Sequence, residues 1–238
     1  MQRMGKGAQL ARWQQKAAQF IIDIMADHDD GYFFLATREV GTKSWKEHTF
    51  QIGQHEQAIL EHFAKYSRDT HDHYYCSNAF REPERKAEHA LPSSRAWVDI
   101  DNADHSAFDP PPNILIEPSP GRYQGLWLFN DVIDRREAEL YSKALAYNFG
   151  ADKNGWSVTK YLRVPFTFNH KEEYERPRVK LLKFDLTRQN RKAIPVTEEI
   201  WHASSAPIVH VDLKLSKQWR KIYAKYREKL HKRVRFLI

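Results

Sequence analysis

Apolar residues recur at three- and four-residue steps in four stretches of the chain, a spacing that gathers them on one face of a helix. The predicted helices cover residues 8–26, 54–66, 134–149 and 215–234. Asp134 can cap the third of these helices, because its side chain can accept a hydrogen bond from the first turn. Gly150 stands where that helix should end.

Short apolar or alternating stretches between turn residues predict strands. They cover residues 32–37, 45–52, 73–76, 96–101, 113–116, 123–129 and 178–186. The first two flank a turn at 41–43 and should pair antiparallel. The turn at 118–122 indicates a second hairpin, which we expect to lie beside strand 96–101. Helices and strands do not alternate in regular βαβ units, so the pattern predicts an α+β fold.

Strand 96–101 carries two acids, Asp99 and Asp101, after an apolar run. Side chains alternate across a strand, so both carboxylates should point to the same side. Neighbouring carboxylates repel each other and a divalent cation relieves the repulsion. The pair therefore predicts a site for Mg²⁺ or Mn²⁺, the metals that activate phosphoryl transfer. Such a string is also common in solvated turns, and the pattern alone leaves that alternative open.

The composition is that of a globular protein. Of 238 residues, 41% are hydrophobic and 13% aromatic, which is enough to bury a core. The single cysteine, Cys76, excludes a disulfide framework and a multi-cysteine zinc site, and fits a reducing cytosol. The first residues contain no apolar segment typical of a secretion signal, and no apolar run reaches membrane-spanning length.

The net charge of +7 is concentrated near the C-terminus. Residues 214–238 contain ten Lys or Arg and one acid, a net charge of +9, so residues 1–213 carry about −2. Charge therefore favours nucleic-acid binding for the C-terminal segment and gives no such indication for the rest of the chain.

Three strings, in this order and spacing, resemble the archaeo-eukaryotic primase superfamily and in particular the RepB-like primases of plasmids and phages. They are Asp99-x-Asp101, the hairpin tip Ser119-Pro-Gly-Arg-Tyr-Gln124, and the stretch from Gly150-Ala-Asp152 to Leu162-Arg-Val-Pro-Phe-Thr-Phe-Asn-His-Lys171. The segment 75–95 adds to the likeness, which covers roughly residues 30–185.

The resemblance implies an RNA-recognition-motif-like antiparallel sheet packed with an N-terminal α/β unit. It also implies a template-directed nucleotidyltransferase, a DNA primase or primase-polymerase that makes or extends primers by two-metal catalysis. Asp99 and Asp101 would bind Mg²⁺ or Mn²⁺, and Asp152 would complete the metal site. The implied partners are a single-stranded DNA template and nucleoside triphosphates, in the cytoplasm of a bacterial host that carries the plasmid or phage.

The residue types in these strings fit that chemistry. Nucleotidyl transfer leaves the protein mainly positioning and charge stabilisation to perform. Ser119, Arg122 and Gln124 at the 118–122 turn are candidate nucleotide-binding residues. Arg122 and Gln124, two residues apart on the strand that leaves this turn, can point to one side and reach triphosphate oxygens. Arg163 can make paired phosphate contacts, and Lys171 offers a point charge. Asn169 is a secondary candidate for the same nucleotide.

Three departures from the superfamily pattern support an alternative. Gln124 stands where His is frequent, Phe166 where Gly is usual, and Ser157 where another Asp is often found. Glutamine cannot carry charge, and a residue larger than glycine hinders close backbone approach to phosphate. The alternative is a weakened or inactive primase-fold initiator that still binds single-stranded nucleic acid.

Two domains are expected, a catalytic domain over 1–213 and a basic helix over 214–238. This helix either binds nucleic acid or begins a following domain, such as a helicase module, and we expect no membrane binding. Its candidate nucleic-acid contacts are Lys217, Arg220, Lys221 and Lys225. The string His71-Asp72-His73 is similar to the paired histidines of rolling-circle nickases, but the middle residue there should be apolar.

Overall fold

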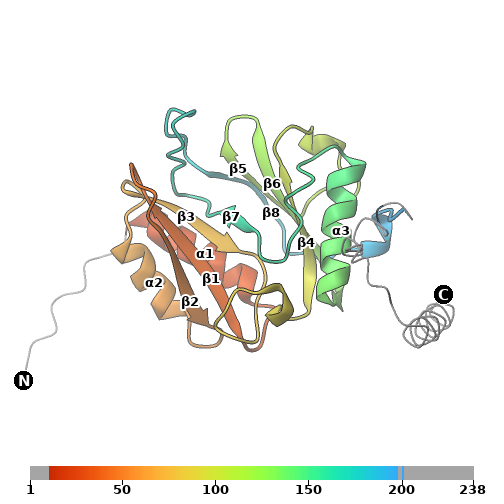
Figure 1. Ribbon diagram of the computed structural model, residues 1–238, viewed down its shortest axis with the longest axis horizontal. Helices are drawn as coiled ribbons and strands as arrows, with labels where there is room; N and C mark the ends of the chain where they lie inside the picture. Colours follow the sequence, from red (N-terminus) through yellow and green to blue (C-terminus); the bar gives the residue numbers. More distant parts are fainter. Residues whose placement is uncertain (1–10, 198–199, 201–238) are drawn as a thin grey trace, which may run out of the picture. The chain divides into compact units, whose positions relative to one another are not determined.

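The computed structural model describes residues 11–197 and residue 200. Over these residues the chain forms two four-stranded antiparallel sheets and three α-helices (Figure 1). The predicted α+β class with antiparallel sheets is confirmed. The basic segment 214–238, with its four candidate contacts, lies outside the described residues.

The first sheet has the strand order β2-β1-β3-β7. Its strands are β1 (Tyr32–Glu39), β2 (Trp45–Gln51), β3 (His71–Cys76) and β7 (Tyr161–Arg163). The helices α1 (Arg12–Met25) and α2 (Glu56–Lys65) pack on one of its faces, where Phe20 of α1 meets Tyr75 and Phe63 of α2 meets His73. The predicted β1–β2 hairpin is confirmed, and helix 54–66 begins two residues later than its pattern suggests.

The second sheet has the order β4-β6-β5-β8. Its strands are β4 (Ser93–Ile100), β5 (Ile114–Ser119), β6 (Arg122–Ile133) and β8 (Lys180–Phe184), and α3 (Arg135–Asn148) packs against β4. The hairpin β5–β6 does lie beside the acid-bearing strand, as expected. Asp134 caps α3 by accepting a hydrogen bond from the Glu137 N–H at 2.9 Å. Short 3₁₀ turns cover Ala87–His89, His105–Ala107 and Arg191–Ala193.

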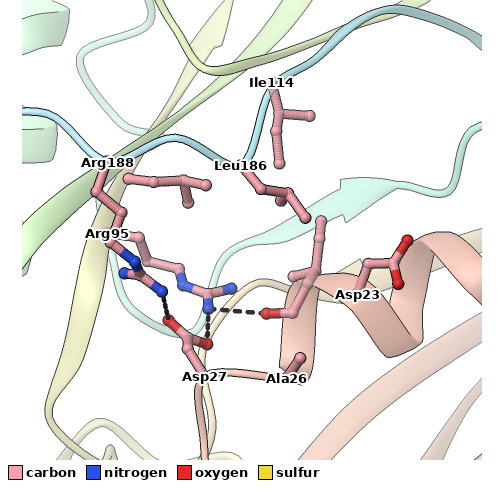
Figure 2. A pocket seen from close by; sticks show the side chains of 9 residues that line it. Asp23, Ala26, Asp27, Arg95, Ile114, Leu186 and Arg188 are labelled. Carbon is pink, nitrogen blue, oxygen red and sulfur yellow. Dashed lines mark hydrogen bonds and ion pairs between the residues drawn. The ribbon is translucent and has the colours of Figure 1, made fainter.

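A buried ionic network joins the end of α1 to the start of β4 (Figure 2). The Arg95 side chain is 2% exposed; it donates to the carbonyl of Ile24 at 2.8 Å and to the carboxylate of Asp27. Arg188 contacts the other Asp27 oxygen at 3.5 Å. A cavity of about 220 Å³ lies beside them. Because an unpaired buried charge is costly, this network fixes how the helix meets the second sheet.

Apolar side chains fill the core, and two tryptophans near the acid-bearing strand are among them. Trp97 and Trp127 are at most 1% exposed and belong to the core cluster. Cys76 is fully buried, as expected of a small hydrophobe, and its thiol lies 3.2 Å from the Val158 carbonyl. No helix in residues 11–197 is long and apolar enough to cross a bilayer.

Three histidines are packed together between α2 and the first sheet. The His62 ring lies 4.7 Å from the His48 ring and 5.9 Å from the His73 ring. Burial, with help from neighbouring positive charges, lowers the pKa of His48 to about 4 and that of His73 to about 3, and holds the pKa of His62 well below its ordinary value. These side chains are therefore neutral in the folded protein at physiological pH.

This cluster predicts a loss of stability in mild acid. Below about pH 6.5 the unfolded chain takes up protons that the folded chain does not, so the free energy of unfolding should fall from there down to about pH 4. His62→Phe keeps an aromatic ring at the site, and the His62 Nε2 has no hydrogen-bond partner among the described residues. Thermal melts of wild type and variant should agree near pH 8, and the variant should lose less stability by pH 5. Equal pH dependence would contradict the prediction.

Candidate active site

The two acids of the predicted pair lie at the end of β4. Asp99 is the second-last residue of the strand, and Asp101 follows the strand end. The flanking Val98 and Ile100 are buried, whereas the Asp99 and Asp101 side chains are 14% and 37% exposed. This alternation is the one expected for carboxylates on the same side of a strand.

Asp152, the third predicted acid, lies next to Asp99. The Asp152 backbone N–H donates to the Asp99 carbonyl at 3.1 Å. The close approach of the two segments depends on Gly155, where an added Cβ would lie 3.2 Å from the Asp99 Cβ. The turn after α3 therefore brings together two acids that are 53 positions apart in the sequence (152 − 99).

Lys160 is a site residue that the sequence motifs did not identify. Its Nζ lies 3.1 Å from the Asp99 Oδ2 and 3.9 Å from the Asp152 Oδ2. A lysine just before a short apolar strand has no distinguishing pattern, so no local signal marks it. Burial raises the pKa of Asp99, and the charge of Asp101 adds to this, while Lys160 acts in the opposite direction.

The β5–β6 hairpin brings its motif to the same place. Gly121 has φ +73° at the tip, a conformation that favours glycine. Arg122 pairs with Asp101, its Nη1 lying 3.2 Å from the Asp101 Oδ2, and faces Ser119 across the hairpin. Gln124 lies opposite Asp99 in the sheet, so one hairpin places Arg122 and Gln124 next to the acids.

Arg163 is held differently from the prediction that it contacts a phosphate. Its side chain is only 6% exposed, and its Nη1 donates to the Asp72 Oδ1 at 2.9 Å. Its backbone N–H donates to the Gln124 side chain at 2.9 Å. In this arrangement Arg163 links β7 to the hairpin, and its Nη1 is paired with Asp72.

Asp72 is a second residue that the motifs missed. It is fully buried and contacts Arg38 at 2.6 Å, Arg163 at 2.9 Å and the backbone N–H of His170 at 2.9 Å. Burial alone would raise the pKa of Asp72, but Arg163, the His170 N–H and Arg38 outweigh it and hold that pKa below its usual value. Asp72, the middle residue of the His71-Asp72-His73 string, therefore forms an ionic centre of the first sheet.

The segment after β7 packs on the hairpin. The buried Asn169 donates to the Pro118 carbonyl at 3.2 Å and accepts from the Lys171 N–H at 3.2 Å. The Lys171 ammonium is half exposed and lies 3.4 Å from a Glu173 oxygen. Asn169 thus positions the hairpin, while Lys171 stays accessible on the surface.

Phe166 occupies a backbone conformation that normally favours glycine. Its φ is +70°, which costs a residue with a side chain about 1–3 kcal/mol. Its N–H donates to the Val179 carbonyl at 2.8 Å, and its carbonyl accepts from Arg68 at 2.9 Å. These bonds hold the loop in the bend that a glycine would favour, so the departure at this position does not remove the bend.

The carboxylates of Asp99, Asp101 and Asp152 are of the ligand type that a divalent cation prefers. Carboxylate oxygens are the ligands that Mg²⁺ and Mn²⁺ prefer, and the Lys160 ammonium already places positive charge between Asp99 and Asp152. Within residues 11–197 and 200, no group of three or more His, Cys, Asp or Glu side chains is arranged to hold a metal. A metal would therefore rest on Asp99 with Asp101 or Asp152, and Lys160 would have to yield its position.

Comparison with solved structures finds the same fold. A crystal structure of primase RepB′ aligns with a TM-score of 0.59 and 16% identity over 95% of this chain and 69% of that chain. The catalytic domain of primase RepB′ in complex with initiator DNA gives 0.58 and 17% identity, over 82% of this chain and 94% of that one. The AEP domain of the cyanophage S-2L primase-polymerase gives 0.55 and 10%, over 76% and 98%.

Comparison with curated proteins gives no match. Comparison with protein families matches residues 80–214 to the RepB DNA-primase N-terminal domain. That region is more than half of the chain. Within the described residues it contains β4, the β5–β6 hairpin, α3, β7 and β8, together with the three acids, Lys160 and the hairpin motif. The protein belongs to the RepB DNA-primase N-terminal domain family.

Proposed function

We propose that this protein is a template-directed nucleotidyltransferase, a primase or primase-polymerase of a plasmid or phage. The observation that carries the proposal is the meeting of Asp99, Asp101 and Asp152 at one end of β4, beside Lys160 and Arg122. The family and the fold of RepB′ and of the cyanophage enzyme support the same reaction class.

Asp99 would hold Mg²⁺ or Mn²⁺ together with either Asp101 or Asp152. The metal would supply charge stabilisation for the attacking and leaving oxygens of the transfer. Asp99 is largely withdrawn from water, and this strengthens its interaction with any cation. Lys160 neutralises the acids when no cation is bound and can turn toward phosphate oxygens when one is.

The hairpin and the following loop would bind the incoming triphosphate. Arg122 and Lys171 are accessible cations on neighbouring segments, and the Gln124 amide lies between Asp99 and β7. Ser119 lies opposite Arg122 at the turn. Arg163 and Asn169 act as positioning residues, because their side chains are buried and bonded to Asp72 and to the hairpin.

Single-stranded DNA is the proposed template. The RepB′ catalytic domain has been crystallised with initiator DNA, and this chain shares its fold. The basic segment, with Lys217, Arg220, Lys221 and Lys225, would add phosphate contacts whose strength falls as salt rises. We place the protein in the host cytoplasm, with a helicase as a candidate partner.

The second candidate function is an initiator that binds DNA without catalysis. The observation that favours it is the position of Lys160, whose ammonium lies between Asp99 and Asp152 where a metal would have to sit. Ser157 does not add an acid to the site; its hydroxyl lies 2.9 Å from that of Thr159.

Primer synthesis and primer extension on single-stranded DNA separate the two functions. We expect the full chain to incorporate labelled nucleotides in Mg²⁺ or Mn²⁺ and to lose that activity when EDTA removes the metal, while it still binds the template. Comparing ribonucleotides with deoxyribonucleotides would show which are used. Tight binding of single-stranded DNA without nucleotide incorporation under any of these conditions would contradict the proposed enzyme activity and support the non-catalytic initiator.

A further inference from the structure

The face of the first sheet opposite α1 and α2 carries a cluster of aromatic and basic side chains. Residues directly opposite each other in a sheet lie on the same face. The strand register therefore aligns Trp45 with Arg38 and Asp72 in one row, and Glu47 with Ala36, Tyr74 and Arg163 in the next. Tyr161 lies opposite Cys76, in the row beyond.

Trp45 is the exposed member of this cluster. It is 46% exposed, a large exposed fraction for a tryptophan. Its ring centroid lies 4.9 Å from that of Tyr74 and 5.4 Å from that of Tyr161, so the two tyrosines support it from the sheet side. The Tyr161 hydroxyl donates to Glu47 at 2.6 Å, and this hydrogen bond holds the Tyr161 ring in place. The indole is thus a rigid aromatic surface that remains open to a ligand.

Positive charge surrounds this aromatic surface. Arg163 lies 4.8 Å from the Tyr74 ring and Arg85 4.1 Å from the Tyr161 ring, while Arg38 is one-third exposed beside Trp45. Three guanidinium groups thus outnumber the two carboxylates of Asp72 and Glu47. Exposed Lys43 precedes Trp45 by two residues at the turn of the β1–β2 hairpin. An aromatic surface within positive charge suits a chain that has both flat bases and phosphates.

The cluster is also continuous with the candidate active site. Tyr161 directly follows Lys160, whose ammonium contacts Asp99. The Arg163 backbone binds Gln124, which lies opposite Asp99 in the second sheet. A DNA strand lying across Trp45 therefore leads to the acids past Tyr161 and Arg163 of β7.

We propose that Trp45 stacks an unpaired base of single-stranded DNA and that Arg38 and Arg85 contact its phosphates. This deepens the proposed function, on which it rests, by assigning the template strand to the open face of the first sheet. Stacking on an aromatic side chain tolerates any base, because every base has a flat face. The surface therefore holds the strand without reading its sequence.

The test measures binding of a labelled single-stranded oligodeoxynucleotide to the full chain, without metal or nucleotide. We expect Trp45→Ala to weaken binding about tenfold or more and Trp45→Phe to keep most of it. Val132→Ala is the matched control: Val132 is an apolar residue of β6 with 72% exposure, and its loss should leave binding unchanged. Trp45→Phe and Val132→Ala should melt near the wild-type temperature. Trp45→Ala loses its contacts with Tyr74 and Tyr161 and should melt somewhat lower, but it should stay folded at the assay temperature.

Further arms separate this proposal from its alternatives. Trp45→Ala should raise the template concentration for half-maximal primer synthesis and leave the KM for nucleotide unchanged. A raised KM for nucleotide alone would assign the stacked base to the incoming nucleotide and overturn the proposal. Wild-type affinity in Trp45→Ala would overturn it while leaving the enzyme intact. If the wild type binds DNA but incorporates no nucleotide, the proposed function is wrong. The effect of Trp45→Ala on DNA binding would still decide the role of Trp45.

Discussion

Asp99→Asn should reduce nucleotide incorporation about a thousandfold or more while leaving the fold intact. Asparagine keeps one neutral oxygen but lacks the negative charge and the second oxygen that would hold a metal. A loss of ~4 kcal/mol of transition-state stabilisation corresponds to a factor of this size. Asparagine has nearly the same shape as aspartate. The pairing with Gln124 and the hydrogen bond from the Asp152 N–H to the carbonyl of residue 99 should therefore remain. Steady-state primer extension in Mg²⁺ and in Mn²⁺ measures the effect.

The same substitution should not destabilise the protein at neutral pH. Burial raises the pKa of Asp99 in the folded state, even with Lys160 beside it. An acid with a raised folded pKa lowers stability above that pKa, because the unfolded chain ionises more readily. Asp99→Asn should therefore melt at the wild-type temperature or higher near pH 7, and any gain should shrink toward about pH 4.

Asp104→Asn is the matched control. Asp104 is an exposed acid in the loop after β4, where its side chain accepts a hydrogen bond from the Ser106 N–H at 2.8 Å. Asparagine can make the same cap, so activity and stability should both stay near wild type. Incorporation by Asp99→Asn within tenfold of wild type would remove Asp99 from the catalytic site.

Local sequence patterns were sufficient where neighbours along the chain pair with each other. The apolar run at 32–37 and the alternation in 45–52 predict the β1–β2 hairpin. The turn at 118–122 predicts β5–β6 beside the acid strand. The Asp134 cap is equally local. In each case the hydrogen-bond partner lies within a few residues or across one turn, so the signal is present in a short window.

Partners distant in the sequence could not be predicted in this way. β7 has only three residues and pairs with β3, which lies 85 positions earlier at its closest (161 − 76). Lys160 is a site residue only because that pairing places it against Asp99. Asp72 has the same origin, since its partners Arg38, Arg163 and His170 come from three separate segments.

Asp72→Asn should destabilise the protein by about 3–5 kcal/mol, the cost of leaving a buried charge uncompensated. The Arg163 side chain is 6% exposed, and its Nη2 already has no hydrogen-bond partner among the described residues. Denaturant unfolding at neutral pH measures the loss. Asp69→Asn is the control, because its ion pair with Arg176 joins two exposed side chains and should contribute less than about 1 kcal/mol.

The pH dependence and a double variant distinguish lost charge from damaged packing. The pKa of Asp72 is lowered in the folded state, so its stabilisation is present above about pH 3.8 and is lost as the pH falls below that value. The gap between wild type and Asp72→Asn should therefore close in acid. Arg163→Met removes the stranded charge, so Asp72→Asn/Arg163→Met should be less destabilised than the sum of the two single variants. Strict additivity would mean that the pair is not the source of the loss, and that Asp72 stabilises β3 through its bonds to Arg38 and the His170 backbone instead.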